Sequence, residues 1–196
     1  MDKLKLKGVS EFEYLPFIRD DGAKFLFNFC KEHKPLKVLE IGTFLGYSGS
    51  LILSAYENTQ LVTVEISEEN FKNAGENFKS AKLSSRVKQI LGDAKDVICE
   101  LEEKKEEFDL IFLDGPKGQY IRYYPTLKKL LKTGGYLIAD NVYLHGMVNS
   151  KEYPIHKHRS MVLNLRAFLK TIQEDADIST TIYEIADGIS VSKKIK

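Results

Sequence analysis

Residues 38–49 read VLEIGTFLGYSG, and the other elements of this chain can be placed around them. The first four residues are an apolar run that contains an acid, Glu40, and Gly42 and Gly46 then open a segment of helical composition. This order predicts a strand, a tight turn and a helix. Glycines at such a turn let the backbone bend sharply and let a ligand approach closely, as in the βα turns that bind nucleotides.

The spacing of this turn, E-x-G-x-x-x-G, differs from the G-x-G-x-x-G of dinucleotide-binding proteins and disfavours a dehydrogenase. Glu40 stands where a pyrophosphate would otherwise lie, so its carboxylate would repel a phosphate and suit a ligand that carries positive charge. S-adenosylmethionine, with its sulfonium and ammonium groups, is such a ligand. The alternative on this motif alone is a glycine-tolerant loop in some other α/β protein.

Strand-like and helical segments alternate along the rest of the chain, which ends in two β runs close enough to form a hairpin. We expect Gly134 and Gly135 to close the helix before the fifth strand, and a polar loop, 142–159, to precede the last helix. The strand-like runs after the first are 61–65, 87–91, 108–113, 136–139, 180–185 and 189–192. This pattern predicts the α/β class, with a doubly wound, mostly parallel seven-stranded sheet and a C-terminal antiparallel hairpin.

Length and composition favour an ordinary globular protein. The chain has 196 residues, 43% of them hydrophobic, so we expect a single domain over 1–196 with residues 1–17 as an N-terminal arm. The 29 basic and 28 acidic residues leave a net charge of +1, which indicates no particular anionic partner. The 2 cysteines are typical of reduced thiols. No run approaches the roughly 20 apolar residues that cross a bilayer, so we expect a cytoplasmic protein without membrane contact.

Acidic residues stand at the ends of five predicted strands: Glu40, Glu65, Asp93, Asp114 and Asp140. Ligands of doubly wound sheets bind beyond the carboxyl ends of the strands, so these residues should converge. Glu65 follows Gly46 by about 20 residues, the offset at which an acid holds ribose hydroxyls. Asp93 and Ala94 would then face the adenine. A single acid in such a loop is usually a turn residue or a helix cap.

Asp114, Asp140 and Asn141 form a separate group, because the fourth and fifth strands should be neighbours. Two carboxylates and an amide are hard oxygen ligands that suit Mg²⁺ or Ca²⁺ and are poor for zinc. Mg²⁺ commonly keeps several positions for water or substrate oxygens, so this site leaves room for two adjacent oxygens of a substrate. The alternative is an Asp-Asn pair that forms a turn and caps a helix.

Lys117 comes three residues after Asp114 and is the candidate base. Beside a divalent cation its ammonium form is disfavoured, so its pKa should fall and the neutral amine could remove a hydroxyl proton. The cation would lower the pKa of the same hydroxyl. His145, in the loop after the fifth strand, is a second candidate base.

With these residues in place, the chain resembles the cation-dependent class I O-methyltransferases, the family of the catechol and caffeoyl-coenzyme A O-methyltransferases. The resemblance covers about residues 14–194. It rests on LEIGTFLGYSG, the acid Glu65, GDA at 92–94, IFLDGPKGQY at 111–120 and IADN at 138–141. The family implies a Rossmann-like methyltransferase fold, S-adenosylmethionine and Mg²⁺ as cofactors, and a possible homodimer, although its usual front helices are longer than those expected here.

The resemblance also implies a role for each matching residue. The methionine end of the cofactor would contact Glu40, Gly42 and Ser48. The ribose would contact Glu65, and the adenine would contact Asp93 and Ala94. The family likewise implies that Mg²⁺ is held by Asp114, Asp140 and Asn141, and that Lys117 is the base. The full set of cofactor-binding candidates is Glu40, Gly42, Gly46, Ser48, Glu65, Asp93, Ala94 and Asp114.

Within the family, the segments ADGISVSKK and DNVYLHGMV are most similar to the bacterial tRNA 5-hydroxyuridine methyltransferases. We therefore expect 5-hydroxyuridine in tRNA as the acceptor, with a small catechol-like phenol as the alternative, since both offer two vicinal oxygens. A tRNA substrate needs basic and aromatic residues beside the site. Candidates for such contacts are Tyr143, Lys151, Tyr153, His156, Lys157, His158, Arg159, Lys193, Lys194 and Lys196.

A non-catalytic RNA-binding module that retains the cofactor fold is the alternative from another class. The metal ligands together with Lys117 argue against it, because a module without chemistry has no need of an ion beside a base.

Overall fold

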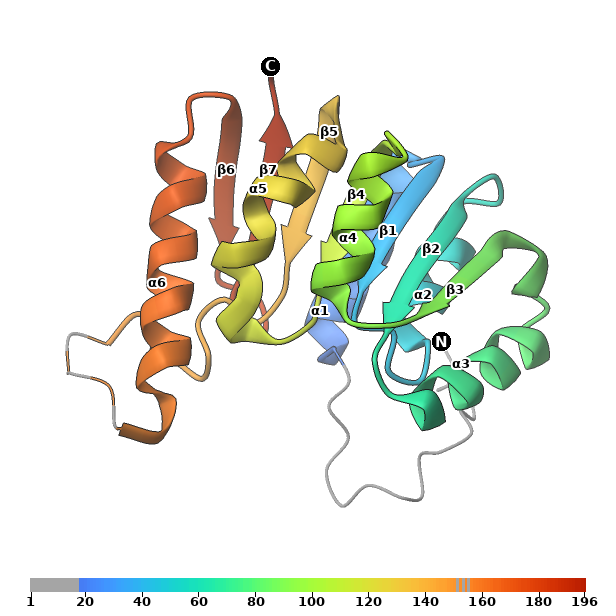
Figure 1. Ribbon diagram of the computed structural model, residues 1–196, viewed down its shortest axis with the longest axis horizontal. Coiled ribbons are helices and arrows are strands. Elements are labelled where there is room, and N and C mark those ends of the chain that lie inside the picture. Colours follow the sequence, from blue (N-terminus) through green and yellow to red (C-terminus); the bar gives the residue numbers. More distant parts are fainter. Residues whose placement is uncertain (1–17, 151, 153, 155) are drawn as a thin grey trace. The chain divides into compact units, whose positions relative to one another are not determined.

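The first half of the chain contains parallel strands that end in or near acidic residues (Figure 1). The computed structural model describes residues 18–150, 152, 154 and 156–196, so the predicted arm, 1–17, lies outside the described residues. The chain divides into two compact units, 1–97 and 98–196. The single domain expected over both units stays a prediction, and each unit is described by itself.

In the first unit, three parallel strands lie in the order β3-β2-β1. The strands are β1 (Lys37–Ile41), β2 (Gln60–Glu65) and β3 (Val87–Leu91). The helices are α1 (Asp20–His33), α2 (Tyr47–Ala55) and α3 (Glu68–Ser80), with the short η2 (Ser84–Arg86) before β3 and α4 (Ala94–Glu103) running on into the second unit.

Local sequence signals explain where these elements begin and end. Lys34 adopts the left-handed conformation after α1, and Pro35 follows it, so the helix stops there. The Oγ of Ser67 accepts a hydrogen bond from Asn70 N (3.3 Å), which makes Ser67 the N-cap of α3. The α3 side chains Ala74 and Phe78 are buried against the unit's core. The predicted strand, turn and helix of residues 38–49 are confirmed.

In the second unit, the strands lie in the order β4-β5-β7-β6, with β4 and β5 parallel and the last two antiparallel. The strands are β4 (Phe108–Leu113), β5 (Leu131–Ala139), β6 (Ile178–Tyr183) and β7 (Ile189–Lys194). The helices are η3 (Lys117–Gln119), α5 (Tyr120–Leu130), η4 (His156–His158) and α6 (Arg159–Glu174). The predicted α/β class, with seven strands and a C-terminal antiparallel hairpin, is confirmed.

The prediction for the start of β5 is wrong. The glycines at 134 and 135 do not close α5, which ends at Leu130, but lie inside β5, where the pairing with β4 shifts register. Gly134 has φ 86°, and a Cβ on Gly135 would lie 2.9 Å from Asp109 O. Glycine therefore allows a bulge at this position. The helical composition of the preceding residues had suggested instead that the two glycines end a helix.

The segment after β5 is also more structured than the predicted polar loop. Val142, Leu144 and Val148 are buried, so this segment contributes apolar side chains to the core of the second unit. Helix α6 lies along β6 (Figure 1) and packs on α5 through edge-on contacts of Phe168 with the rings of Tyr120 and Tyr124. None of the described helices is long and apolar enough to cross a membrane.

Two helical glycines provide a test of the packing in the first unit. A Cβ on Gly49 of α2 would lie 2.8 Å from buried Leu61 Cδ2 and 3.0 Å from Glu40 Oε2, whereas one on Gly75 of α3 would meet the end of the Gln89 side chain at 2.9 Å. We expect Gly49→Ala to lower the free energy of unfolding by about 1 to 3 kcal/mol because it overpacks the core. Gly75→Ala should stay within about 1 kcal/mol of the parent, since alanine favours a helix. Urea unfolding followed by circular dichroism measures both, and equal stabilities would contradict this packing.

Candidate active site

Glu40 lies in β1 and is completely buried. Its Oε1 accepts a hydrogen bond from Ser48 Oγ (2.5 Å), and its Oε2 accepts one from Thr63 Oγ1 (2.6 Å). The hydroxyl of Thr43 lies 2.5 Å from that of Thr63. The structure therefore brings Glu40 and Ser48 together and adds two threonines that sequence reasoning missed. The register of β1 and β2 places Thr63 opposite Glu40, and because register is not visible in a local pattern, the sequence carried no clear signal for this threonine.

Glu65 ends β2 and holds the same turn through the main chain. Its Oε2 accepts from Phe44 N (2.7 Å), and its Oε1 accepts from the backbone N–H groups of Ile66 (3.0 Å) and Ser67 (2.9 Å). An ionised carboxylate offers about four acceptor positions, so among the described residues one position on Oε2 remains for a donor such as a ribose hydroxyl. The carboxylate thus has a structural task besides the predicted binding role.

The turn after β1 is fixed by close packing. Gly42 and Gly46 have φ values of 100° and 79°, and a Cβ on Gly46 would lie 2.8 Å from Phe78 Cζ. Only glycine lets α3 approach this closely. Asn77 Nδ2 also donates a hydrogen bond to Leu45 O (3.0 Å), which joins the middle of α3 to the turn.

The third acidic strand end has a capping role. Asp93 Oδ1 accepts a hydrogen bond from Lys95 N (2.8 Å) at the start of α4, and Gly92 N donates to Glu65 O (2.8 Å), which ties this turn to the end of β2. Asp93 therefore fits the helix-cap alternative, and Ala94 is the first residue of the helix.

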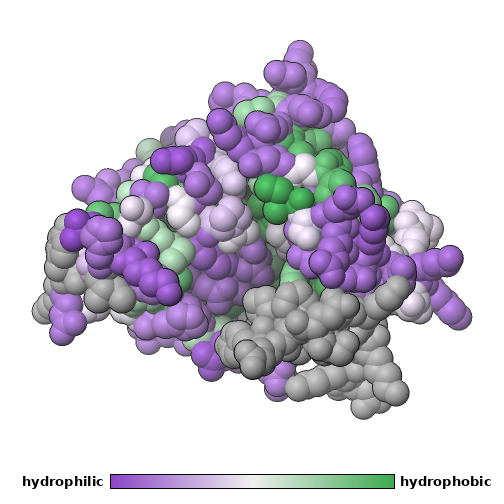
Figure 2. Space-filling view, turned by 60° about the horizontal axis from the view of Figure 1, so that its bottom comes forward, coloured by the Kyte–Doolittle hydropathy of each residue, from purple (hydrophilic) through white to green (hydrophobic). Residues whose placement is uncertain are grey.

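Ile66 is a candidate that sequence reasoning missed. Its side chain is 70% exposed directly after Glu65, and Leu91, which pairs with Glu65 from β3, is also exposed. Hydrophilic residues cover most of the face seen in Figure 2, and hydrophobic residues gather in small areas. Exposed apolar side chains beside a carboxylate suit the flat face of a purine. The sequence signal for this candidate was an isoleucine at a loop position where a polar residue is expected.

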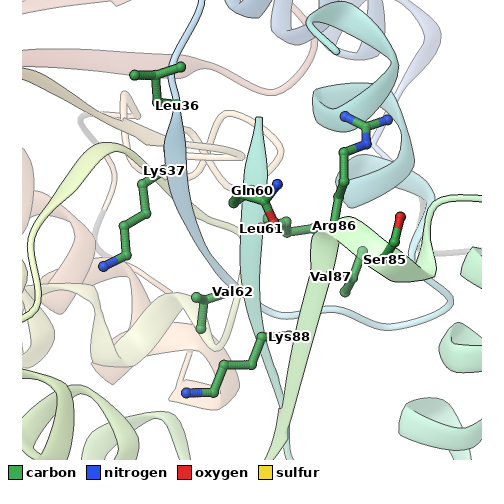
Figure 3. A pocket seen from close by; sticks show the side chains of 9 residues that line it. All are labelled: Leu36, Lys37, Gln60, Leu61, Val62, Ser85, Arg86, Val87 and Lys88. Carbon is green, nitrogen blue, oxygen red and sulfur yellow. The ribbon is translucent and has the colours of Figure 1, made fainter. Parts of the chain in front are cut away.

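A groove of about 380 Å³ lies at the opposite, amino ends of β1, β2 and β3. Lys37 and Lys88 point the same way on either side of Val62, whereas Arg86 points away from them (Figure 3). The Arg86 guanidinium donates to three backbone carbonyl groups at the end of α2 and after it. None of the predicted site residues lines this groove, so it is separate from the candidate active site.

In the second unit, the ends of β4 and β5 lie side by side because Leu113 pairs with Ala139. Asp114 follows the first strand and Asp140 the second, and Asp140 N donates to Leu113 O (3.1 Å). The structure therefore brings these two acids to one edge of the sheet, as the predicted strand order requires.

Lys117, the first residue of η3, is hydrogen-bonded on two sides. Its Nζ donates to Asp114 Oδ1 (2.6 Å) and to the hydroxyl oxygen of Tyr120 (2.8 Å), and that hydroxyl donates to Leu113 O (2.9 Å). The Lys117 side chain is 15% exposed. Sequence reasoning missed Tyr120, although its position three residues after Lys117, on the next helical turn, was a usable signal.

The charge state of Lys117 depends on these neighbours. Burial lowers the pKa of Lys117, but Asp114, Tyr120 and Asp140 together raise it, and the pKa ends above its usual value. The predicted fall in pKa was for a lysine beside a bound divalent cation. Without the cation the pKa of Lys117 is raised instead, because the Asp114 carboxylate stabilises the ammonium form.

Asp140 has one satisfied and one unsatisfied carboxylate oxygen. Oδ1 accepts a hydrogen bond from Asn141 N (2.8 Å), whereas Oδ2 is buried without a hydrogen-bond partner among the described residues. Burial, together with the negative charge of Asp114, raises the pKa of Asp140 to about 6. An unpaired buried carboxylate oxygen is costly, and a cation would remove that cost.

These residues fit a hard divalent cation. Across the described parts of the chain, no group of three or more His, Cys, Asp or Glu side chains could hold a metal, so the site needs the amide of Asn141 as a third ligand. Two carboxylates and an amide oxygen are ligands that Mg²⁺ accepts.

His145, the second candidate base, is held by its main chain. Its N–H donates to both carboxylate oxygens of Asp187, at 2.7 and 2.8 Å. The imidazole is 81% exposed, with Nδ1 3.7 Å from Asp187 Oδ2. This arrangement favours Lys117 over His145 as the base, because the lysine is buried beside the candidate metal ligands.

The fold class, together with similar solved structures that hold SAM or SAH, defines a Rossmann-like methyltransferase that uses S-adenosylmethionine. The model of the O-methyltransferase family matches residues 7–195, and the chain belongs to that family. The protein is therefore an S-adenosylmethionine-dependent O-methyltransferase, and the predicted family is confirmed.

Three relatives illustrate the similarity. The caffeoyl-CoA O-methyltransferase of Medicago sativa is 28% identical over 185 residues, which are 90% of this chain and 74% of the relative. An O-methyltransferase from Bacillus cereus in complex with SAH has a TM-score of 0.80 and 28% identity, over 91% of this chain and 82% of that chain. TomG from Streptomyces achromogenes, an O-methyltransferase involved in tomaymycin synthesis, in complex with SAM, has a TM-score of 0.82 and 26% identity, over 93% and 84%.

The remaining acceptor position of Glu65 leads to a prediction about cofactor binding. Glu65→Gln should weaken S-adenosylmethionine binding by about 10-fold or more, because a hydrogen bond to a charged group contributes roughly 1.5 to 3 kcal/mol. Isothermal titration calorimetry measures the change. Glu69→Gln, at an exposed position in the first turn of α3, is the matched control and should bind as the parent does. Equal affinities of the two variants would argue against a role for Glu65.

Asp140 should reduce stability in the metal-free protein and increase it when a cation is bound. Asp140→Asn removes a buried charge, so we expect a higher midpoint of urea unfolding without metal and a loss of Mn²⁺ binding by at least about 10-fold. Glu103→Gln, an exposed acid of the same unit, should change neither quantity. Unchanged Mn²⁺ affinity in Asp140→Asn would rule out Asp140 as a ligand.

Proposed function

We propose that this methyltransferase uses a divalent cation, Mg²⁺ first, and methylates one hydroxyl of a small catechol-like phenol that carries a second oxygen on the neighbouring carbon. The observation that carries the proposal is the buried Oδ2 of Asp140, which lacks a hydrogen-bond partner among the described residues. It belongs to the same electrostatic cluster as Asp114 and Lys117. A cation would balance this cluster and hold two substrate oxygens.

Residues of the first unit are proposed to hold most of the cofactor. The buried negative charge of Glu40, fixed by Ser48, suits the positively charged methionine end. The open acceptor position of Glu65 suits a ribose hydroxyl, and the exposed side chain of Ile66 suits the adenine. The proposed set in this unit is Glu40, Gly42, Gly46, Ser48, Glu65, Ile66, Asp93 and Ala94. When bound, the cofactor supplies a methyl group that is activated by its sulfonium.

Asp114, Asp140 and Asn141 are proposed to hold the cation. When bound, the cation supplies a positive charge that lowers the pKa of a neighbouring hydroxyl. The three residues leave coordination positions for a substrate, which supports an acceptor with two vicinal oxygens.

Lys117 is proposed to take up the hydroxyl proton at Nζ. Its burial favours the neutral amine once the Asp114 carboxylate is engaged by another positive charge. Tyr120 fixes the position of Nζ, because its hydroxyl donates to Leu113 O and leaves its oxygen as an acceptor for the lysine. The base is therefore held in one place and shielded from bulk water.

The relatives support a small phenol as the acceptor. The Medicago sativa relative is named for caffeoyl-CoA, whose caffeoyl group is a catechol with two vicinal hydroxyls. Such a group matches the two positions that the proposed cation site leaves for substrate oxygens.

A second candidate acceptor is 5-hydroxyuridine in tRNA, and one observation favours it. The basic run 156–159 ends shortly before Met161 in α6, whose Cα would lie 3.8 Å from a Cβ on Gly118. Asn164 Nδ2 also donates to Gly118 O (2.8 Å). The basic run thus lies close to the turn that carries Lys117. Two other candidates for tRNA contacts, Lys151 and Tyr153, lie outside the described residues.

A non-catalytic RNA-binding module is less well supported. The buried oxygen of Asp140 that has no partner in the described part of the chain costs stability, and a protein without chemistry has no reason to retain it. The ion pair between Lys117 and Asp114 beside it adds a group that can exchange protons.

A methyl-transfer assay with labelled S-adenosylmethionine tests the proposal on two substrate sets. We expect turnover of a catechol panel in the presence of Mg²⁺, and a loss of at least about 100-fold on addition of a chelator, since cation and base act together. The second substrate set is bulk tRNA from cells that lack the gene for this protein. Methylation of tRNA alone, with the label recovered in 5-methoxyuridine, would make 5-hydroxyuridine the substrate, and chelator-resistant turnover would contradict the cation-dependent mechanism.

Matched lysine variants control this assay. Lys117→Met removes the proposed base from a buried site, whereas Lys129→Met removes an exposed lysine of α5 that pairs with Glu102. Lys129→Met should keep the activity of the parent, and Lys117→Met should lose it while binding S-adenosylmethionine normally.

A further inference from the structure

The segment that follows Asp140 is held in an unusual backbone conformation. Three non-glycine residues, Asn141, Leu144 and His145, have positive φ values of 54°, 47° and 55°. Each such residue costs roughly 1 kcal/mol or more, and this conformation persists only where the surroundings enforce it. We call residues 141–150 the Asn141 loop.

The turn of the β6–β7 hairpin holds the Asn141 loop from one side. Val142 N donates to Gly188 O (3.0 Å), and Tyr143 N donates to Asp187 O (2.9 Å). The carboxylate of Asp187 accepts the N–H of His145 through both oxygens, at 2.7 and 2.8 Å. These contacts continue the pairing of β5 with β7, in which Ala139 lies opposite Ser190.

Close packing at the same turn requires glycine. Gly188 has φ 82°, and a Cβ at this position would lie 2.6 Å from Cγ of Tyr143. The hairpin turn and the start of the Asn141 loop are therefore in direct contact, with no room for a side chain between them.

Helix α6 holds the other end of the Asn141 loop. Arg166 Nε donates to Val148 O (3.0 Å), and its Nη2 donates to Met147 O (3.2 Å) and Ser150 O (2.6 Å). A guanidinium with three carbonyl partners fixes the end of the loop that the hairpin does not reach.

We infer that Asp187 is a positioning residue for the proposed cation site, an inference that rests on the proposed function. By fixing the His145 main chain, Asp187 keeps the Asn141 loop closed and its first residue in the left-handed conformation. In that conformation the Asn141 N–H reaches Asp140 Oδ1 and leaves Oδ2 for the cation. Asp187 therefore acts through Asn141 and Asp140 rather than on the substrate.

The carboxylate of Asp187 is well suited to this task. Its side chain is 11% exposed, so most of the carboxylate is held within the protein while it accepts from the exposed residue His145. A charged acceptor binds a backbone N–H about twice as strongly as a neutral one. Losing it would let the left-handed residues relax toward ordinary φ values and disorder the proposed cation ligands Asp140 and Asn141.

Three variants test the inference: Asp187→Ala, Asp187→Asn and the control Glu184→Gln, which removes an exposed charge from the same hairpin. Hydrogen exchange of the metal-free protein should show faster exchange over residues 141–148 in Asp187→Ala. Calorimetry with Mn²⁺ should show a dissociation constant raised about 10-fold to 100-fold, as for other residues that support a metal ligand. In the methyl-transfer assay, the KM for Mg²⁺ should rise while kcat at saturating Mg²⁺ changes little.

Asp187→Asn retains one acceptor oxygen and should lie between the parent and Asp187→Ala, which keeps the test valid if the alanine variant does not fold. Glu184→Gln should match the parent in every measurement. Parent-like exchange and Mn²⁺ affinity in both Asp187 variants would overturn the inference. A parent protein that binds no Mn²⁺ would overturn the proposed cation site itself, and the inference with it, before any variant is considered.

Discussion

The register between β4 and β5 is the constraint on which the candidate catalytic cluster depends. Because Leu113 pairs with Ala139, the next residue of each strand brings a carboxylate to the same edge of the sheet. A shift of one residue would turn the side chains of one strand to the opposite face. The bulge at Gly134 and Gly135 sets this register, so two glycines remote from the cluster decide where Asp140 lies relative to Asp114.

The buried acids of the two units differ in how fully they are satisfied. Glu40 and Glu65 accept hydrogen bonds through both of their carboxylate oxygens, and these bonds shape the turns around them. Asp140 keeps one buried oxygen without a partner among the described residues. A fully bonded carboxylate can exist for structure alone, whereas an unbonded one is costly unless a ligand completes it. Glu40 and Glu65 therefore also stabilise the fold, whereas the unsatisfied oxygen of Asp140 is best explained as a ligand of a cation.

The loop that follows Asp140 is held in place rather than free to swing as a lid. The hairpin turn fixes its first half, Arg166 fixes its second half, and its own residue Val142 is completely buried. A rigid loop keeps ligands of a cation near their working geometry, and its strain is supported by contacts from two other elements. The N–H groups of Val142, Tyr143 and His145 donate to Gly188 or Asp187, more than 40 positions away in the chain, and Arg166 donates to carbonyl groups of the same loop from another helix. No local pattern can specify such contacts.

The amino-acid sequence by itself determined the order of strands and helices, the turn at 42–46 and the acids at the strand ends, because hydrophobic periodicity and glycine placement are local properties. It misplaced the start of β5, since a glycine pair that ends a helix and one that forms a bulge look alike in sequence. Only the tertiary structure decided that Tyr120 and Asp114 both bond Lys117, that one Asp140 oxygen is unpaired within the described ranges and that Asp187 holds His145. Those relations depend on strand register and on contacts between residues distant in the chain, and the energy that fixes them exists only once the core has formed.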